Sequence, residues 1–229
     1  MTLIVPNGRI VIYSDIGCPW ASLAVHRLRA RRRALGLEGA VLLDHRAWPL
    51  ELVNGRCTPK PTIDAEVAVI GSHEPALGWR PWRRPTHTYP ATTLLALEAV
   101  QAAKIDAVGG LAGSEDLDAA LRDAFYVGSE PISIYPAVIN VARGCPSVDV
   151  AALEDRLQAG AGRPEVFEQW GRAREDGVTG SPHLFLPGGE DVQNPGIKIQ
   201  WSQETGQGFP RIMADDPSAI DTILRRAAA

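Results

Sequence analysis

The sequence predicts an α/β protein in which helices cover both faces of a mixed sheet and a helical block interrupts the chain. A β-α-β pattern opens the chain and a β-β-α pattern closes it. Between them, residues 91–176 show helical periodicity without a strand signal. Without the block the order is β-α-β-β-β-α. We therefore expect an α/β domain formed by residues 1–90 and 177–229, with residues 91–176 as an inserted helical subdomain.

The opening β-α-β unit consists of two strands joined by one helix. The β-branched run Arg9–Ser14 predicts a buried strand, and residues 20–35 predict an amphipathic helix. Pro19 suits the first position of that helix, where a missing N–H costs nothing. Residues 40–44 predict the second strand. Since a whole helix connects the strands, we expect them to be parallel. The arginines of residues 27–33 predict a solvated helix face.

Residues 47–90 are punctuated by seven prolines, which predicts a long irregular loop that carries the specificity. Within it, residues 79–85 read Trp-Arg-Pro-Trp-Arg-Arg-Pro. These side chains could bind a carboxylate or line a pocket. We expect the tryptophans to pack and the arginines to stay solvated.

Five helices are expected in the helical block, over residues 91–104, 116–127, 134–142, 149–159 and 164–177. Strand character then returns at residues 182–186 and again at 197–201, and we expect these two strands to pair as a hairpin with a long loop. Asp216 and Pro217 predict the start of a final helix.

Composition and charge exclude several classes of protein. Apolar residues make up 45% and charged residues 22% of the 229 residues, as in ordinary globular proteins. The net charge of −4 argues against nucleic acid as a partner. No apolar run is long enough to cross a membrane, and residues 1–13 lack the order of a signal peptide. We expect a cytoplasmic protein with neither a nucleic-acid nor a membrane partner.

The sequence contains three cysteines, Cys18, Cys57 and Cys145, which excludes a scaffold held together by disulfides. No Cys-x-x-Cys pair or histidine spacing indicates a metal site. Cys18 lies where a helix follows a strand. Because helix N-termini stabilise anions, we expect a lowered thiol pKa and a reactive thiolate. The alternative is a small buried residue at a strand–helix junction.

Four segments resemble the DsbA-like thioredoxin-fold family, especially its FrnE-type branch. Residues 14–20, Ser-Asp-Ile-Gly-Cys-Pro-Trp, resemble the active-site entry of that branch, which usually reads Ser-Asp-x-x-Cys-Pro-Trp-Cys. Residues 46–51, 121–127 and 177–182 resemble the segment after the second strand, a region of the helical insertion and the cis-proline loop. The segments occur in the order found in the family and span nearly the whole chain.

The resemblance implies a thioredoxin-like fold and thiol–disulfide exchange. It implies that Cys18 is the nucleophile and that Pro182 is cis and faces it. Pro19, Trp20, Ser181 and Pro182 would then contact the substrate. Taken from the residues alone, Pro182 is explained equally well as the first residue of a strand.

The chain departs from the family at Ala21, which replaces the second active-site cysteine. A mixed disulfide on Cys18 then needs another thiol to resolve it. Glutathione or mycothiol could serve as co-substrate, with no bound cofactor, or Cys57 could act from its loop. Cys145 is expected to be structural. His26 and His183 could tune Cys18, but a structural or surface role is the simpler expectation for both.

Two other classes of function stay open. The same architecture resembles the kappa-class glutathione transferases and 2-hydroxychromene-2-carboxylate isomerases, in which a serine at the position of Cys18 helps a bound glutathione thiolate. A non-catalytic thioredoxin-fold binding module is the third class. We expect the substrate to be a disulfide-containing protein or a small thiol. The sequence does not identify it, and leaves open whether the protein is a homodimer.

Overall fold

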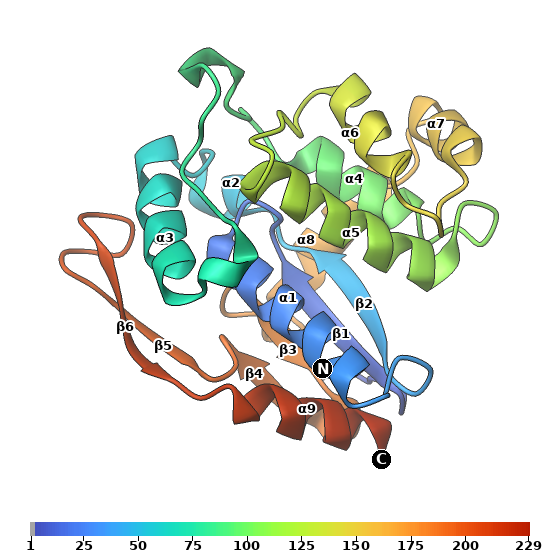
Figure 1. Cartoon of the computed structure of the whole chain (residues 1–229). Coiled ribbons are helices and arrows are strands. Elements are labelled where there is room, and N and C mark those ends of the chain that lie inside the picture. The colour runs from blue at the N-terminus through green and yellow to red at the C-terminus, as the bar shows by residue number, and fades with distance from the viewer. Residues whose placement is uncertain (1–2) are drawn as a thin grey trace.

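The computed structural model describes residues 3–229. Met1 and Thr2 lie outside the described residues; they begin the segment that lacks the order of a signal peptide. A four-stranded sheet lies at the centre of the molecule, in the order β2-β1-β3-β4 (Figure 1). Its strands are β1 (Arg9–Ser14), β2 (Leu42–Ala47), β3 (His183–Phe185) and β4 (Asp191–Gln193). β1 and β2 are parallel, as predicted, and β3 is antiparallel to both of its neighbours. The predicted mixed sheet is confirmed.

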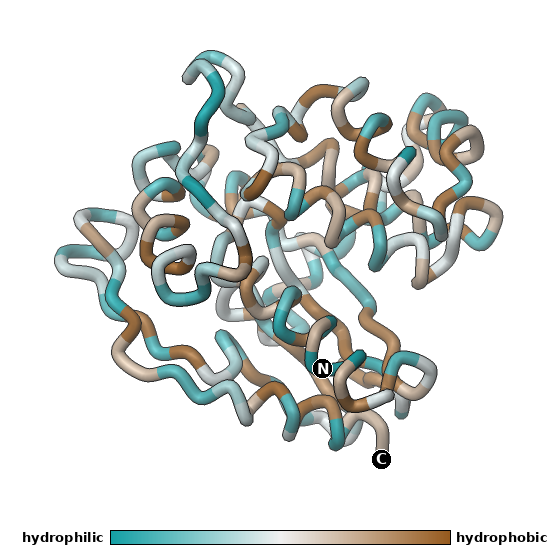
Figure 2. The backbone as a smooth tube through the Cα atoms, viewed as in Figure 1, coloured by the Kyte–Doolittle hydropathy of each residue, from teal (hydrophilic) through white to brown (hydrophobic). Residues whose placement is uncertain are grey.

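Helices cover both faces of this sheet. On one face, α1 (Pro19–Ala34) and α9 (Ser218–Ala228) pack against β1 and β3 through a buried aliphatic cluster that includes Ile12 and Leu184. On the other face, Tyr13 and Phe185 pack with Ala173 at the end of α8. Hydrophobic residues accordingly gather along the central strands, whereas the loop between α3 and α4 is largely hydrophilic (Figure 2). Burial of these apolar surfaces fixes α1, and therefore the residue at its N-terminus, against the sheet.

Contrary to the prediction from the sequence, the arginines of α1 do not all lie on a solvated face. Arg32 is buried and forms a two-pronged ion pair with Glu115, while Arg27 bonds to both Glu74 and Asp215. The carboxylates that bind these guanidinium groups come from segments distant in the sequence. The residue pattern of α1 alone therefore could not predict these ion pairs.

Residues 94–173 fold into five helices with short connections: α4 (Leu94–Ala102), α5 (Gly110–Tyr126), α6 (Tyr135–Ala142), α7 (Val150–Gln158) and α8 (Arg163–Ala173). Asp149 caps α7, as predicted, because its side chain accepts a hydrogen bond from the Ala152 N–H at 3.0 Å. α5 packs against β2 and α4. Within residues 3–229, every helix is too short or too polar to cross a membrane.

The irregular loop predicted for residues 47–90 is wrong in part. This segment contains α2 (Leu50–Asn54), α3 (Lys60–His73) and two short 3-10 turns, η1 (Pro75–Leu77) and η2 (Thr86–Thr88). No proline lies between Pro61 and Pro75, and Pro61 falls in the first turn of α3, where proline is tolerated. The prolines therefore frame α3 rather than break it.

The pairing predicted for the C-terminal strands is also wrong. β3 pairs with β4, a three-residue strand too short to be recognised in the sequence. β5 (Ile197–Trp201) pairs instead with β6 (Pro210–Asp215) in a separate two-stranded hairpin that runs beside α3 (Figure 1). Ile199 and Ile212 on this hairpin pack toward the core.

Candidate active site

Cys18 stands at the N-cap of α1, directly after the turn that leaves β1. Pro19 and Trp20 form the start of the helix, and the Ser22 N–H donates to the Cys18 carbonyl at 3.0 Å. Because the first N–H groups of α1 have no partner within the helix, they form a positive end beside the Cys18 side chain. Ala21, in the same turn, is fully buried.

The loop before β3 lies against Cys18. Its Ser181–Pro182 peptide bond is cis, as the resemblance implied. The Cys18 thiol donates to the Ser181 carbonyl oxygen at 3.2 Å, and the Asp15 N–H donates to Ser181 Oγ at 3.0 Å. These contacts join the two segments, 163 residues apart in sequence, into one site.

Cys18 opens onto a cavity of about 490 Å³, here called the Cys18 cavity. Its walls come from the N-terminus of α1, the α2–α3 region, the Ser181 loop and the tip of the β5–β6 hairpin. The lining residues are Cys18, Pro19, Trp48, Leu50, Asn54, Arg56, Cys57, Thr58, Pro59, Thr62, Ile63, Glu66, Gly180, Ser181, Trp201, Thr205, Gly206 and Gln207. Thr62 Oγ1 donates to the Gly206 carbonyl at 3.1 Å and so ties the hairpin tip to α3. A cavity of this size suits a small molecule or one extended peptide segment.

The predicted lowering of the Cys18 pKa is wrong for the protein as it stands. Burial raises the pKa of Cys18 to about 12, and the negative charge of Glu66 raises it further, whereas a hydrogen bond from the Ala21 backbone lowers it. Cys18 is only 6% exposed. The thiol is therefore protonated at neutral pH, because loss of water around the sulfur outweighs the helix N-terminus.

Glu66 on α3 is the acidic group of this cavity. Its Oε1 accepts a hydrogen bond from Trp20 Nε1 at 2.7 Å, so the carboxyl is held against the first turn of α1. Burial raises the pKa of Glu66 to about 7, against a smaller lowering by the Trp20 bond. The side chain therefore changes charge near neutral pH.

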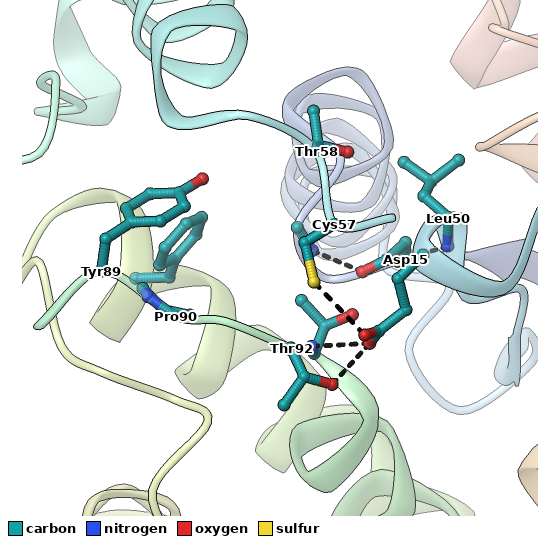
Figure 3. A pocket seen from close by; sticks show the side chains of 11 residues that line it. Asp15, Leu50, Cys57, Thr58, Tyr89, Pro90 and Thr92 are labelled. Atoms are coloured by element: carbon teal, nitrogen blue, oxygen red, sulfur yellow. Dashed lines mark hydrogen bonds between the residues drawn. The ribbon is translucent and has the colours of Figure 1, made fainter. Parts of the chain in front are cut away.

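A second, smaller pocket of about 30 Å³ adjoins the Cys18 cavity and shares Cys57 with it (Figure 3). Glu51 organises this pocket: its carboxylate accepts from Thr92 Oγ1 at 2.6 Å, from the Thr93 N–H at 3.0 Å and from the Cys57 thiol at 3.3 Å. Burial and this bond to Glu51 raise the pKa of Cys57 to about 11. Cys57 therefore borders the same space as Cys18, also as a protonated thiol.

The other residues singled out in the sequence lie elsewhere. Cys145 is buried in the helical block, and His26 lines a different cavity. His183 is buried beside β4, where its Nε2 bonds to Asp191 at 2.9 Å. Trp79 stacks on Tyr126 with ring centroids 4.6 Å apart, as expected of a packed tryptophan.

One cluster offers three potential metal-ligand atoms, from His73, Glu74 and Asp215. The guanidinium of Arg27 bonds to both carboxylates, and His73 Nε2 lies 2.7 Å from Asp215 Oδ2. The guanidinium of Arg27 therefore supplies the positive charge that balances these carboxylates. The cluster connects α1, α3 and β6.

Sequence reasoning missed Glu66, Arg56 and the hairpin residue Trp201. Glu66 had a recognisable signal: it falls on the face of α3 that carries Ile63, Val67 and Ile70, where a charged residue is out of place. Trp201 had none, because it reaches the cavity only through the β5–β6 hairpin.

No protein-family model and no curated sequence matches the chain. Solved structures do match. One, from Streptomyces coelicolor, is described as a probable DsbA oxidoreductase; it is 18% identical, with a TM-score of 0.58 over 96% of this chain and 89% of that one. A 2-hydroxychromene-2-carboxylate isomerase is 17% identical, with a TM-score of 0.57 over 80% and 87%.

A third match is DsbM, a cytosolic disulfide reductase from Pseudomonas aeruginosa solved with glutathione. It is 17% identical, with a TM-score of 0.53 over 81% of this chain and 89% of that one. At these identities the likeness establishes the fold, which agrees with the sheet and helices described above. The chain therefore has the thioredoxin-like fold of DsbA-type oxidoreductases and of the related isomerase, with a helical insertion.

Proposed function

We propose that this protein is a monothiol thiol–disulfide oxidoreductase with Cys18 as its nucleophile. The observation that carries the proposal is the placement of Cys18. It stands at the N-terminus of α1, bonds to the Ser181 carbonyl and opens onto a cavity large enough for a substrate. Ala21 leaves the first turn of α1 without a second thiol.

The exchange proceeds in two balanced steps. Cys18 Sγ attacks one sulfur of a disulfide, the S–S bond of the substrate breaks, and the leaving thiolate takes up the proton that Cys18 lost. A second thiol then attacks the mixed disulfide and regenerates Cys18. The positive end of α1 stabilises both thiolates. Pro19 and Ser181 line the cavity and would orient the substrate, whereas Trp20 and Pro182, also expected to contact it, are absent from the lining.

The resolving thiol is a small molecule such as glutathione or mycothiol, taken as a co-substrate, or else Cys57. The solved complex of DsbM with glutathione supports the first, and the shared cavity supports the second. The partners are accordingly a small thiol or a disulfide-containing protein. We place the reaction in the cytoplasm, where thiols are kept reduced.

The runner-up is a glutathione-dependent isomerase or transferase. The raised pKa of Cys18 favours it, since a protonated thiol would donate a hydrogen bond to a bound thiolate. In the isomerases that the sequence resembles, a serine at that position helps a bound glutathione thiolate. The isomerase among the solved structures has the same fold.

Replacing Ala21 by cysteine tests the proposal by gain of function. The introduced thiol would lie three positions after Cys18 on α1, where it can attack the mixed disulfide. We expect the variant to form an intramolecular disulfide when it is oxidised by air. In that oxidised state it should oxidise a reduced dithiol peptide without added glutathione, which the wild type does not. Peptide mapping of the oxidised variant by mass spectrometry checks the bond. Because Ala21 is fully buried, the larger side chain should cost about 1–3 kcal/mol of unfolding free energy.

A matched control places a cysteine at Ala24, on the next turn of α1 and also buried. This variant should gain no dithiol activity. If Ala21→Cys folds and Cys18 never forms a mixed disulfide with the peptide, Cys18 does not perform the proposed exchange.

A further inference from the structure

We infer that Glu66 accepts the Cys18 proton when the thiol attacks, and returns it to the leaving thiolate. This inference rests on the proposed function, and it adds a catalytic role for a residue that the family motifs do not include. It starts from a difficulty in the site itself: a nucleophilic thiolate is needed, yet Cys18 is buried and protonated.

Glu66 is positioned to solve this difficulty. Glu66 and Cys18 line the same cavity, and the negative charge of Glu66 raises the pKa of Cys18. Oε1 is occupied by the Trp20 indole, two residues after Cys18. Among residues 3–229, no hydrogen bond or ion pair holds Oε2, and no cation neutralises the carboxylate. Oε2 thus has no partner that would prevent it from taking up a proton.

Other ionisable groups surround this pair. Arg56 and Cys57 line the cavity from the α2–α3 loop. The negative charge of Asp15, in the turn before Cys18, also raises the pKa of Cys18, and Tyr89, directly after η2, interacts electrostatically with Glu66. The hairpin contributes only uncharged side chains to the cavity lining. Burial holds the pKa of Tyr89 above its usual range, so it remains neutral where Glu66 titrates. Glu66 is therefore the carboxylate of the cavity that changes protonation near neutral pH.

The proton balance is complete without another reactant. Cys18 gives its proton to Glu66 as its sulfur bonds to the substrate disulfide, and the neutral Glu66 no longer repels the developing thiolate. The leaving thiolate then takes the proton from Glu66, which restores the starting carboxylate. The pKa of Glu66, about 7, suits both directions of transfer.

The test follows the rate at which Cys18 reacts with 4,4′-dithiodipyridine, an uncharged disulfide, from pH 5 to 10. Mass spectrometry reads Cys18 separately from Cys57 and Cys145. In the wild type the rate should rise through about pH 7 as Glu66 ionises. In Glu66→Gln, which keeps an oxygen for the Trp20 bond, that rise should vanish, and the rate at pH 8 should fall about 100-fold.

The sign of the change separates two roles for Glu66. If Glu66 only repels the thiolate, removing its charge lowers the Cys18 pKa and Glu66→Gln reacts as fast as the wild type or faster, which overturns the inference. Glu66→Asp keeps a carboxyl and should restore the inflection, and it provides the test if the glutamine variant does not fold. Glu98→Gln, a buried glutamate paired with Arg163 outside the cavity, should leave the profile unchanged.

Failure of the underlying proposal would look different. If Cys18 of the wild type does not react at any pH at which the protein is folded, exchange by Cys18 is wrong and the Glu66 role falls with it. If Cys18 reacts with a profile that glutamine does not alter, exchange survives and Glu66 alone is excluded.

Discussion

Cys18→Ser should reduce thiol–disulfide exchange to the rate of the buffer. Serine is nearly the same size as cysteine, and its hydroxyl can still donate to the Ser181 carbonyl that now accepts from the thiol. A serine hydroxyl is too weakly acidic and too poor a nucleophile to attack a disulfide in this setting. The measurement is glutathione-coupled reduction of a small disulfide, with the unfolding free energy as a check that the fold is retained.

The two other cysteines supply matched controls. Cys145→Ser removes a buried thiol of the helical block and should leave exchange unchanged, while Cys57→Ser should slow it only if Cys57 resolves the mixed disulfide. Full exchange by Cys18→Ser would refute the redox mechanism. A Cys18→Ser variant that lacks exchange but isomerises a glutathione-dependent substrate would instead support the isomerase alternative.

What the sequence predicted well depends on contacts within one short segment. The strand Arg9–Ser14, the turn after it and the helix starting at Pro19 follow from local periodicity, and these elements alone place Cys18 at a helix N-terminus. The cis Ser181–Pro182 bond came from the resemblance, because X-Pro bonds are cis in only about 5–6% of cases.

The predictions from the sequence that were wrong concern features formed by segments that come together only in the folded protein. The local rule lowers the Cys18 pKa, but burial of the thiol in the folded protein reverses the direction, and the negative charge of Glu66 on α3 adds to it. Trp201 likewise reaches the cavity through a hairpin whose pairing differs from the one that the sequence predicts. Glu66 does carry a signal, since it interrupts the apolar face of α3, but the prolines around that helix predict a loop instead.

Asp118→Asn should destabilise the protein by about 3–5 kcal/mol, because it removes the counter-charge of a buried arginine. Asp118 and Arg122 are one turn apart on α5, with bonds of 2.7 and 3.0 Å between them, and both are almost fully buried. Burial alone would raise the pKa of Asp118, but the Arg122 guanidinium outweighs it and the pKa is lowered. Urea unfolding at pH 7 measures the loss of unfolding free energy.

Lowering the pH provides an independent check, because the direction in which the stability difference should change is known. Because the pKa of Asp118 is lower in the folded protein than its ordinary value of 3.8, its contribution to stability is complete above that value and is lost as the pH falls below it. The difference between wild type and Asp118→Asn should therefore shrink below about pH 3.8. A variant that loses less than about 1 kcal/mol at pH 7 would contradict the argument.

The pair also links the helical block to the active-site turn. Arg122 donates to the Asp15 carbonyl at 3.2 Å, to Ser22 Oγ at 2.8 Å and to Ser14 Oγ at 2.9 Å, so it holds both sides of the turn before Cys18. Replacing both Asp118 and Arg122 by leucine removes the unpaired charge and should recover part of the lost stability. It cannot recover these three bonds, so exchange by Cys18 should remain impaired even where the fold is regained.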